Sequence, residues 1–251
     1  MTGDDLVVAT TIAASARDHL VARRAALAAA GADPGTWGAV GDAEANDLIL
    51  ERLAALRPDD AVLSEESADD PVRLGRSRVW IVDPLDGTRE FATPGRVDWA
   101  VHVALVVDGA PLVGAVALPD GRVLCGTEPA TPPGPRPRPR LVVSRSRPPQ
   151  VAVAVADALG YEIVELGSAG AKIASVVDGT NDAYLHAGGM QQWDSAAPVA
   201  AALGAGLWAS RIDGTPLRYN GADPSVPDLL VARAEVAPDL LAAVARLGGI
   251  G

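Results

Sequence analysis

The sequence predicts an α/β fold, and three observations support this. Hydrophobic residues make up 49% of the 251 positions, which is enough for a sizeable buried core and excludes wholesale disorder. Short apolar runs with the length of strands are interspersed with longer segments whose apolar residues recur at helical spacing. After residue 140 strands and helices alternate regularly, which favours a layered α/β arrangement for the second half.

Two helices are predicted at the start of the chain. Apolar residues recur at roughly helical spacing over residues 4–30, and Gly31 ends this helix. A loop is expected over 32–41. The second helix is expected over 43–57, with Asp42 as its N-cap.

The remainder of the first half is predicted to form strands. The clearest pair is joined by Asp108-Gly109, because Asp-Gly is a favoured two-residue hairpin turn. The predicted strands cover residues 61–63, 79–82, 99–107, 110–118 and 122–127.

The segment TPPGPRPRPR, residues 131–140, is the predicted boundary between two halves, residues 1–130 and 141–251. Alternating Pro and Arg can continue neither a helix nor a central strand, so an extended exposed linker is expected. A surface loop inside a single domain is the equal alternative. The second half is predicted to contain strands 141–144, 162–166, 182–186, 206–210 and 228–232 and helices 149–159, 170–178, 194–204 and 236–246.

Net charge and residue usage exclude several functions. A formal charge of −11 would repel a phosphate backbone, so no nucleic-acid polymer is expected as a partner. Cys125 is the single cysteine and the three histidines are widely separated, so a bound metal would be a hard cation with oxygen ligands. No apolar stretch approaches ~18 residues and no signal peptide is evident. A cytoplasmic protein without a membrane span is therefore predicted.

Acidic residues stand where predicted strands end. Two follow the first strand, two follow the second, and one lies after a Gly-Gly loop at a predicted helix start. These residues are Glu65, Glu66, Asp83, Asp86 and Asp194. Taken singly they are explained by turn dipeptides, an exposed acidic loop or a helix N-cap. Their order and shared setting instead indicate an active site built on loops at strand ends.

The segment DPLDGT is suited to binding both a cation and a phosphate. Asp83 and Asp86 are three residues apart across a bend, so both carboxylates and the Leu85 carbonyl can face one point. Gly87 permits a close backbone approach, and Thr88 offers a hydroxyl and an N–H near a helix start. Such hard oxygens beside a phosphate cradle are what a Mg²⁺-dependent phosphoryl site needs.

The motifs SEES, VWIVDPLDGTREF, GSAGAK and WDSAAP, in this order, resemble the lithium-sensitive, Mg²⁺-dependent inositol monophosphatase superfamily. The resemblance extends from about Asp42 to the end of the chain. It implies the layered αβαβα sandwich of the inositol monophosphatase and fructose-1,6-bisphosphatase type. It also implies phosphate-ester hydrolysis by a metal-activated water with two or three Mg²⁺ ions. Members are often dimers, so a homodimer is an expected partner state.

The resemblance also assigns metal ligands. Glu65 would bind the first metal, Asp83 would bridge two metals, and the Leu85 carbonyl would complete the first site. Asp86 and Asp194 would hold the second metal.

Three further residues receive catalytic roles from the resemblance. Thr88 would pair with Asp42 to orient and deprotonate the attacking water, and Glu66 would support the site or help place a further metal. For Asp42, helix capping is an equal and compatible interpretation.

Within the superfamily, the CysQ-type 3'(2'),5'-bisphosphate nucleotidases show the greatest similarity. They share a basic residue before Glu-Phe, here Arg89, and a Lys at the end of GSAGAK, here Lys172, the one Lys among 21 basic residues. Each could also be a solvated surface charge. Ala187 stands where inositol monophosphatases carry an inositol-binding Glu, and His186 stands near an Arg of the eukaryotic nucleotidases. His186 would either stack on adenine or be a buried strand residue.

The resemblance therefore implies hydrolysis of the 3'-phosphate of 3'-phosphoadenosine 5'-phosphate, and of its sulfated analogue as a link to sulfate assimilation. The expected substrate contacts are Gly87, Thr88, Arg89, Ser168, Lys172 and His186. A broad phosphatase of inositol or fructose phosphates is one alternative. A catalytically silent metabolite-binding regulator on the same scaffold is the other.

Overall fold

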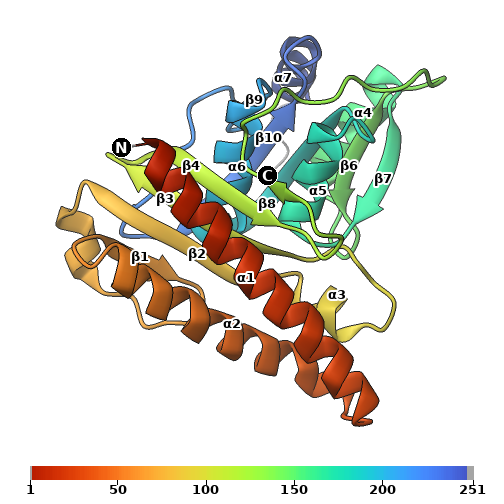
Figure 1. Cartoon of the computed structure of the whole chain (residues 1–251). Helices are drawn as coiled ribbons and strands as arrows, with labels where there is room; N and C mark the ends of the chain where they lie inside the picture. The colour runs from red at the N-terminus through yellow and green to blue at the C-terminus, as the bar shows by residue number, and fades with distance from the viewer. Residues whose placement is uncertain (1, 248–251) are drawn as a thin grey trace.

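The computed structural model describes residues 2–247 and consists of five stacked layers (Figure 1). Two helices cover one five-stranded sheet, two helices form a central layer, a second five-stranded sheet follows, and two helices close the far side. The expected αβαβα sandwich is confirmed.

The outer helical layer consists of α1, Thr2–Ala29, and α2, Pro34–Leu56. The loop predicted over 32–41 is wrong, because α2 begins at Pro34 and Asp33 is its N-cap, with its side chain accepting from the Gly35 N–H at 3.0 Å. Asp42 therefore lies inside α2 and is not the N-cap of a helix.

Glycines inside α2 explain that error. Gly38 and Gly41 suggested a loop, but they are contact points where the helix meets its neighbours. A Cβ on Gly38 would lie 2.4 Å from Cγ2 of Thr88, and one on Gly41 would lie 3.1 Å from Leu20, Leu85 and Phe91 side-chain atoms. The glycines let α2 approach the segment that follows the second strand.

The first sheet has the order β1-β2-β3-β4-β5, with β1 parallel to β2 and the other pairs antiparallel. The Asp108-Gly109 hairpin is confirmed, with φ values of 50° and 77° at its two central residues. The elements of this region are β1 Ala61–Ser64, the 3₁₀ helix η1 Pro71–Gly75, β2 Arg78–Asp86, α3 Thr88–Ala92, β3 Ala100–Val107, β4 Ala110–Ala117 and β5 Val123–Leu124.

The second sheet has the order β7-β6-β8-β10-β9, and β6 is parallel to both of its neighbours. Its strands are β6 Arg140–Ser144, β7 Glu162–Leu166, β8 Ala183–Gln191, β9 Trp208–Ser210 and β10 Ser225–Ala232. The helices of this half are α4 Gln150–Leu159, α5 Ala169–Val177, α6 Gln192–Gly204 and α7 Ala237–Arg246.

The Gly-Gly loop predicted before Asp194 is also wrong. Gly188 and Gly189, with φ values of 106° and 84°, lie within β8, which continues to Gln191. The strand tolerates them because its pairing with β10 shifts register between Val226 and Asp228, opposite this segment.

The central helices α5 and α6 join the two halves of the chain. One apolar core combines residues of the first sheet with residues of α5, α6 and the second sheet. The two sheets fall on either side of segment 131–140, but two separate domains stay a prediction. Among the helices described, none combines the length and the apolarity that crossing a bilayer requires.

Candidate active site

The DPLDGT segment lies at the end of β2, where the pairing with β3 shifts register between Asp83 and Asp86. The Asp83 carboxylate accepts from the Leu85 N–H at 3.0 Å, which holds it over the bend. Gly87 has a φ of 95° and forms the N-cap of α3. A Cβ there would lie 3.1 Å from Cβ of Ser168, so glycine permits both the turn and the close contact.

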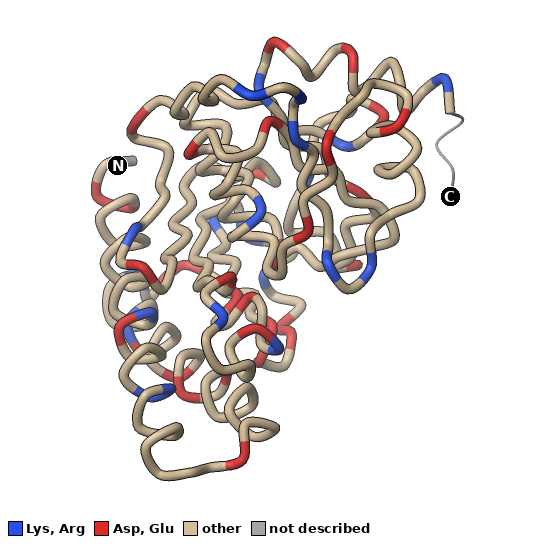
Figure 2. Tube along the Cα trace, turned by 90° about the vertical axis from the view of Figure 1, so that its right-hand side faces the viewer, with Lys and Arg blue, Asp and Glu red and all other residues tan. Residues whose placement is uncertain are grey.

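Three carboxylates from two elements converge at this point. Asp83 and Asp86 come from β2, and Asp194 comes from the first turn of α6, where its carboxylate accepts from the Gln191 N–H at 2.6 Å. One oxygen from each lies within 4.8 Å of the others. Figure 2 shows acidic positions gathered near the middle of the molecule.

The carboxylates of the cluster are buried or half-buried and repel one another when ionised. Burial, followed by the charges of Asp86 and Glu65, raises the pKa of Asp83 well above its usual range. Burial and the charge of Asp86 raise the pKa of Asp194 to about 6. Oxygen-only ligands that repel one another when ionised are suited to a hard divalent cation. The residues present therefore fit the metal that the sequence predicted.

Asp86 differs from its neighbours because it is well paired. Its Oδ2 accepts from the Ser168 hydroxyl at 2.6 Å and from the Gly170 N–H at 2.7 Å. Burial alone would raise its pKa, but His102, Lys172 and Ser168 together lower the pKa to about 2. Asp86 therefore stays ionised across the physiological range.

Glu65 and Glu66 follow β1 and are exposed at the edge of the site. The backbone N–H of Glu65 donates to the Val82 carbonyl at 3.2 Å, which ties this loop to β2. Partial enclosure and the charge of Asp194 raise the pKa of Glu65 to about 7, although the side chain keeps one face open to solvent. Glu65 is not among the three carboxylates within 4.8 Å of one another.

Asp42 and Thr88, which the resemblance paired, lie within hydrogen-bond distance of each other. The Thr88 hydroxyl lies 3.3 Å from Oδ2 of Asp42 and 3.2 Å from the Leu85 carbonyl. Burial raises the pKa of Asp42 to about 7, and Glu66 and Glu65 contribute in the same direction. Its Oδ1 is buried and has no hydrogen-bond partner among residues 2–247. A carboxylate with a pKa near neutrality beside a hydroxyl has the properties of a general base.

A cavity of about 490 Å³ opens beside these residues and has walls from both halves of the chain. All six predicted substrate contacts line it: Gly87, Thr88, Arg89, Ser168, Lys172 and His186. Asp86 and Asp194 of the acidic cluster also line it, as does Glu65, so these carboxylates and the basic side chains face one space. Asp83 lies buried behind them.

The basic wall residues differ in how they are held. Lys172 is buried, its ammonium donates to the Gly167 carbonyl, and it lies 5.2 Å from the Tyr184 ring centroid. Burial lowers the pKa of both Lys172 and His186. His186 Nε2 lies 3.0 Å from the Gly189 carbonyl oxygen.

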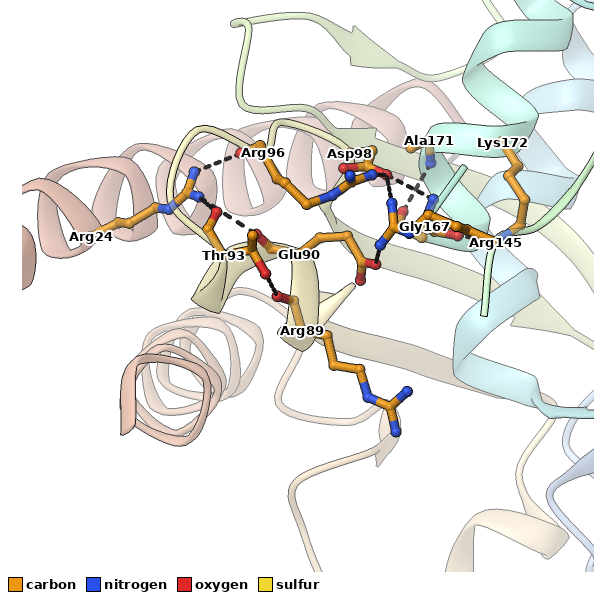
Figure 3. Close-up of polar contacts among 11 residues, drawn as sticks. Arg24, Arg89, Glu90, Thr93, Arg96, Asp98, Arg145, Gly167, Ala171 and Lys172 are labelled. Atoms are coloured by element: carbon orange, nitrogen blue, oxygen red, sulfur yellow. Dashed lines mark hydrogen bonds and ion pairs between the residues drawn. The ribbon is translucent and has the colours of Figure 1, made fainter. Parts of the chain in front are cut away.

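Arg89 is exposed and extends away from the neighbouring ionic cluster (Figure 3).

The inositol monophosphatase family model matches residues 8–128 and 140–247. The chain belongs to the inositol monophosphatase family. It is 55% identical over 222 residues to a Mycobacterium bovis protein named 3'-phosphoadenosine 5'-phosphate phosphatase, covering 84% of this chain and 83% of that one.

More distant relatives agree with this placement. A Salmonella typhimurium protein named 3'(2'),5'-bisphosphate nucleotidase CysQ is 34% identical over 194 residues, covering 71% of this chain and 77% of that one. The solved structure of inositol monophosphatase from Anabaena (Nostoc) superposes with a TM-score of 0.77 at 22% identity, covering 96% of this chain and 95% of that chain. The last comparison supports the fold alone.

Sequence reasoning missed two residues of this family member's site. His102 in β3 is fully buried, with Nε2 3.2 Å from Oδ2 of Asp86 and Nδ1 3.2 Å from the Trp193 carbonyl oxygen. A single histidine inside an otherwise apolar strand was the available signal. Arg147 lines the cavity and follows β6, the same strand-end setting that identified the acidic residues.

Proposed function

We propose that this chain is a Mg²⁺-dependent phosphatase that converts 3'-phosphoadenosine 5'-phosphate to AMP and phosphate. One observation carries the proposal. An acidic cluster suited to divalent cations opens through Asp86 and Asp194 into a cavity that basic side chains suited to phosphate also line, in a chain 55% identical to a protein named for this activity.

The metal would be held by the carboxylates of Asp83, Asp86 and Asp194, with Glu65 and the Leu85 carbonyl completing a set for two or three Mg²⁺ ions. Mg²⁺ bound there would neutralise phosphate charge and lower the pKa of a water molecule. Oxygen ligands and unpaired negative charge support Mg²⁺ over a metal that prefers nitrogen or sulfur.

Thr88 and Asp42 would move the proton of the attacking water. The Thr88 hydroxyl donates to Asp42, so its own oxygen is left to accept a hydrogen bond from the water. As the water passes a proton to Thr88, Thr88 would pass its own proton to the Asp42 carboxylate, which becomes neutral. Glu66 is exposed nearby and raises the pKa of Asp42, which favours proton transfer at neutral pH.

The second phosphate of the substrate would be recognised by arginines. Arg89 and Arg147 are exposed on the cavity wall, and neither guanidinium has a hydrogen bond or ion pair within residues 2–247. Lys172 would contact the phosphate nearer the metals, because it is buried beside Asp86. Free arginines suit a bisphosphate better than a monophosphate.

A phosphate-release panel tests the proposal. It compares 3'-phosphoadenosine 5'-phosphate, its sulfated analogue, inositol 1-phosphate and fructose 1,6-bisphosphate, each with Mg²⁺ and with EDTA. The nucleotides are expected to give the highest kcat/KM, which would fit a role in sulfate assimilation, and millimolar Li⁺ is expected to inhibit. A higher kcat/KM for inositol 1-phosphate would identify a broad phosphatase instead.

The variant Asp83→Asn helps to distinguish an enzyme from a catalytically silent regulator. It is expected to abolish turnover while keeping the circular dichroism spectrum. No phosphate release by the unmodified chain from any substrate would favour the regulator. The homodimer and the compartment stay predictions.

A further inference from the structure

An ionic cluster behind the cavity wall joins the two halves of the chain (Figure 3). Arg145, directly after β6, reaches two carboxylates of the first half. One guanidinium nitrogen donates to Oε1 of Glu90 in α3, and another lies 3.2 Å from Oδ2 of Asp98, which precedes β3. Glu90 is 8% exposed and Asp98 is 9% exposed, so the carboxylates are nearly enclosed.

The backbone before α5 completes the cluster. The Gly167 N–H donates to Oδ2 of Asp98 at 2.7 Å, and the Arg145 N–H donates to the Leu166 carbonyl at 3.0 Å. A Cβ on residue 167 would lie 2.4 Å from Cγ of Glu90. The start of α5 is therefore pressed against α3 at a position that only glycine fits.

The residues that follow Gly167 lie in the active site. The Ser168 hydroxyl and the Gly170 N–H are the two donors to Asp86, and the ammonium of Lys172 returns to the Gly167 carbonyl. A shift of Gly167 would therefore move both donors and the buried ammonium together.

The same cluster also contacts the segment that carries Thr88. Glu90 lies two residues after Thr88 in the short helix α3. Arg145 thus connects the helix that presents the Thr88 hydroxyl to the helix that presents the Ser168 hydroxyl.

Arg145 is the cation shared by both carboxylates. Asp98 is also paired with Arg96, but Glu90 has no other side-chain partner within residues 2–247. Burial and the nearby charge of Asp98 raise the pKa of Glu90. Without Arg145, Asp98 would keep its pair with Arg96, but Glu90 would face the Asp98 carboxylate without a paired cation from residues 2–247.

We propose that Arg145 is a positioning residue: by holding Glu90 and Asp98 together, it fixes the start of α5 against α3 and so fixes the two donors that orient Asp86. This inference rests on the proposed metal site, because Asp86 is one of its ligands. Arg145 itself has no contact with the acidic cluster, so its effect on the site is indirect.

Mn²⁺ binding measured by calorimetry tests this without any substrate. Arg145→Met is expected to weaken Mn²⁺ binding roughly 10-fold, as loss of groups that orient metal ligands does. The matched control is Arg140→Met at the other end of β6. Arg140 pairs with the exposed Glu162, neither residue lines the cavity, and the Mn²⁺ affinity of this variant is expected to be unchanged.

The outcomes separate the two proposals. No Mn²⁺ binding by the unmodified chain would overturn the metal site, and this inference with it. Equal affinities of the unmodified chain and folded Arg145→Met would overturn the positioning role alone.

A second variant covers the case in which Arg145→Met does not fold. Gly167→Ala changes no charge but pushes against Glu90, and it is expected to lower kcat about 10–100-fold, since small misplacements of catalytic groups have effects of this size. The double variant Gly167→Ala/Ser168→Ala is expected to lower kcat little more than the more damaging single variant does, because both substitutions act on Asp86. A combined loss equal to the product of the single losses would contradict the proposal.

Discussion

The hydroxyl of Thr88 lies 3.3 Å from the Asp42 carboxylate, although the two residues are 46 positions apart in the chain. The contact depends on packing of α2 against α3. A Cβ on Gly38 would lie 2.4 Å from Cγ2 of Thr88, so the absence of a side chain at this position allows the two helices to meet. The pair is therefore a product of tertiary packing.

Removing the Thr88 hydroxyl tests its part in proton transfer. Thr88→Ala is expected to lower kcat about 10²–10⁴-fold, the range attributed to a positioned acid or base. Thr88→Ser keeps the hydroxyl and is the control, expected to retain most of the activity. Steady-state phosphate release measures both, and an active Thr88→Ala variant would contradict the assigned role.

Metal removal is expected to change stability in a pH-dependent way. The raised pKa values of Glu65, about 7, and Asp194, about 6, mean that the folded protein holds protons there at pH 5.5. Mg²⁺ must displace those protons, so its affinity falls as the pH drops below about 7. In the metal-free protein the same groups reduce stability as the pH rises from about 4 to 7, because their folded pKa values exceed the unfolded ones.

Differential scanning calorimetry of EDTA-treated protein measures this effect. Mg²⁺ at a hundredfold excess over its Kd is expected to add about 2.7 kcal/mol to the free energy of unfolding. For one fixed concentration the gain in Tm is expected to be larger at pH 8 than at pH 5.5. The reverse order would argue against carboxylate ligands.

Two substrates that differ in one phosphate test whether Arg89 and Arg147 bind the second phosphate. Arg89→Met and Arg147→Met are each expected to raise KM for 3'-phosphoadenosine 5'-phosphate roughly 10-fold, since a hydrogen bond to a charged group contributes about 1.5–3 kcal/mol. The KM for 3'-AMP, which lacks the 5'-phosphate, should change little. Arg138→Met, in the exposed linker, is the control. Equal losses for both substrates would contradict a second-phosphate contact.

Two adjacent aspartates in α1 test the contribution of burial to stability. Asp5 is 4% exposed and pairs with Arg57 at 2.9 Å and with Arg78 at 3.1 Å. The Asp4 side chain is 78% exposed and pairs, among residues 2–247, with Arg57 alone. Asp5→Asn is expected to lower the free energy of unfolding at pH 7 by about 1–3 kcal/mol. Asp4→Asn is expected to lower it by less than about 0.5 kcal/mol.

The loss of stability caused by Asp5→Asn is expected to depend on pH in a definite direction. Burial would raise the pKa of Asp5, but hydrogen bonds from Arg78 and Arg57 lower it overall. A lowered pKa in the folded state gives stability that is present above the unfolded pKa, about 3.9, and is lost as the pH falls through the folded one. Urea unfolding should therefore show the Asp5→Asn difference shrinking below pH 4. A constant difference would indicate that charge is not its cause.

Local patterns in the sequence were sufficient for most strands and helices. The Asp108-Gly109 turn and the acidic residues at the ends of β1 and β2 are signals contained within a few neighbouring positions. Such signals depend on backbone preference and on hydrophobic alternation, which are properties of short segments. The resemblance of four motifs to a known family then predicted that the carboxylates share one metal site.

The errors arose where distant segments determine local structure. Gly38 and Gly41 weaken a helix in isolation, yet packing of α2 against α1 and α3 requires them. His102 received no role from the sequence beyond being one of three widely separated histidines, and its position beside Asp86 depends on the packing of β3 against α5 and α6. A Cβ on Gly170 would lie 2.3 Å from Nε2 of His102, a contact that no single segment contains.

The segment 131–140, which is exposed at Gly134, has a consequence for how the protein is assembled. Gly134 is exposed with open space around it, whereas the largest apolar core draws on both sides of the segment. Cleaving the chain at Gly134 would leave two polypeptides that stay associated, because α5 and α6 of the second pack against the first sheet. Neither polypeptide alone would contain all of the proposed metal ligands, because Asp83 and Asp194 would belong to different molecules. Phosphate release by the two co-expressed fragments would then show that they had associated.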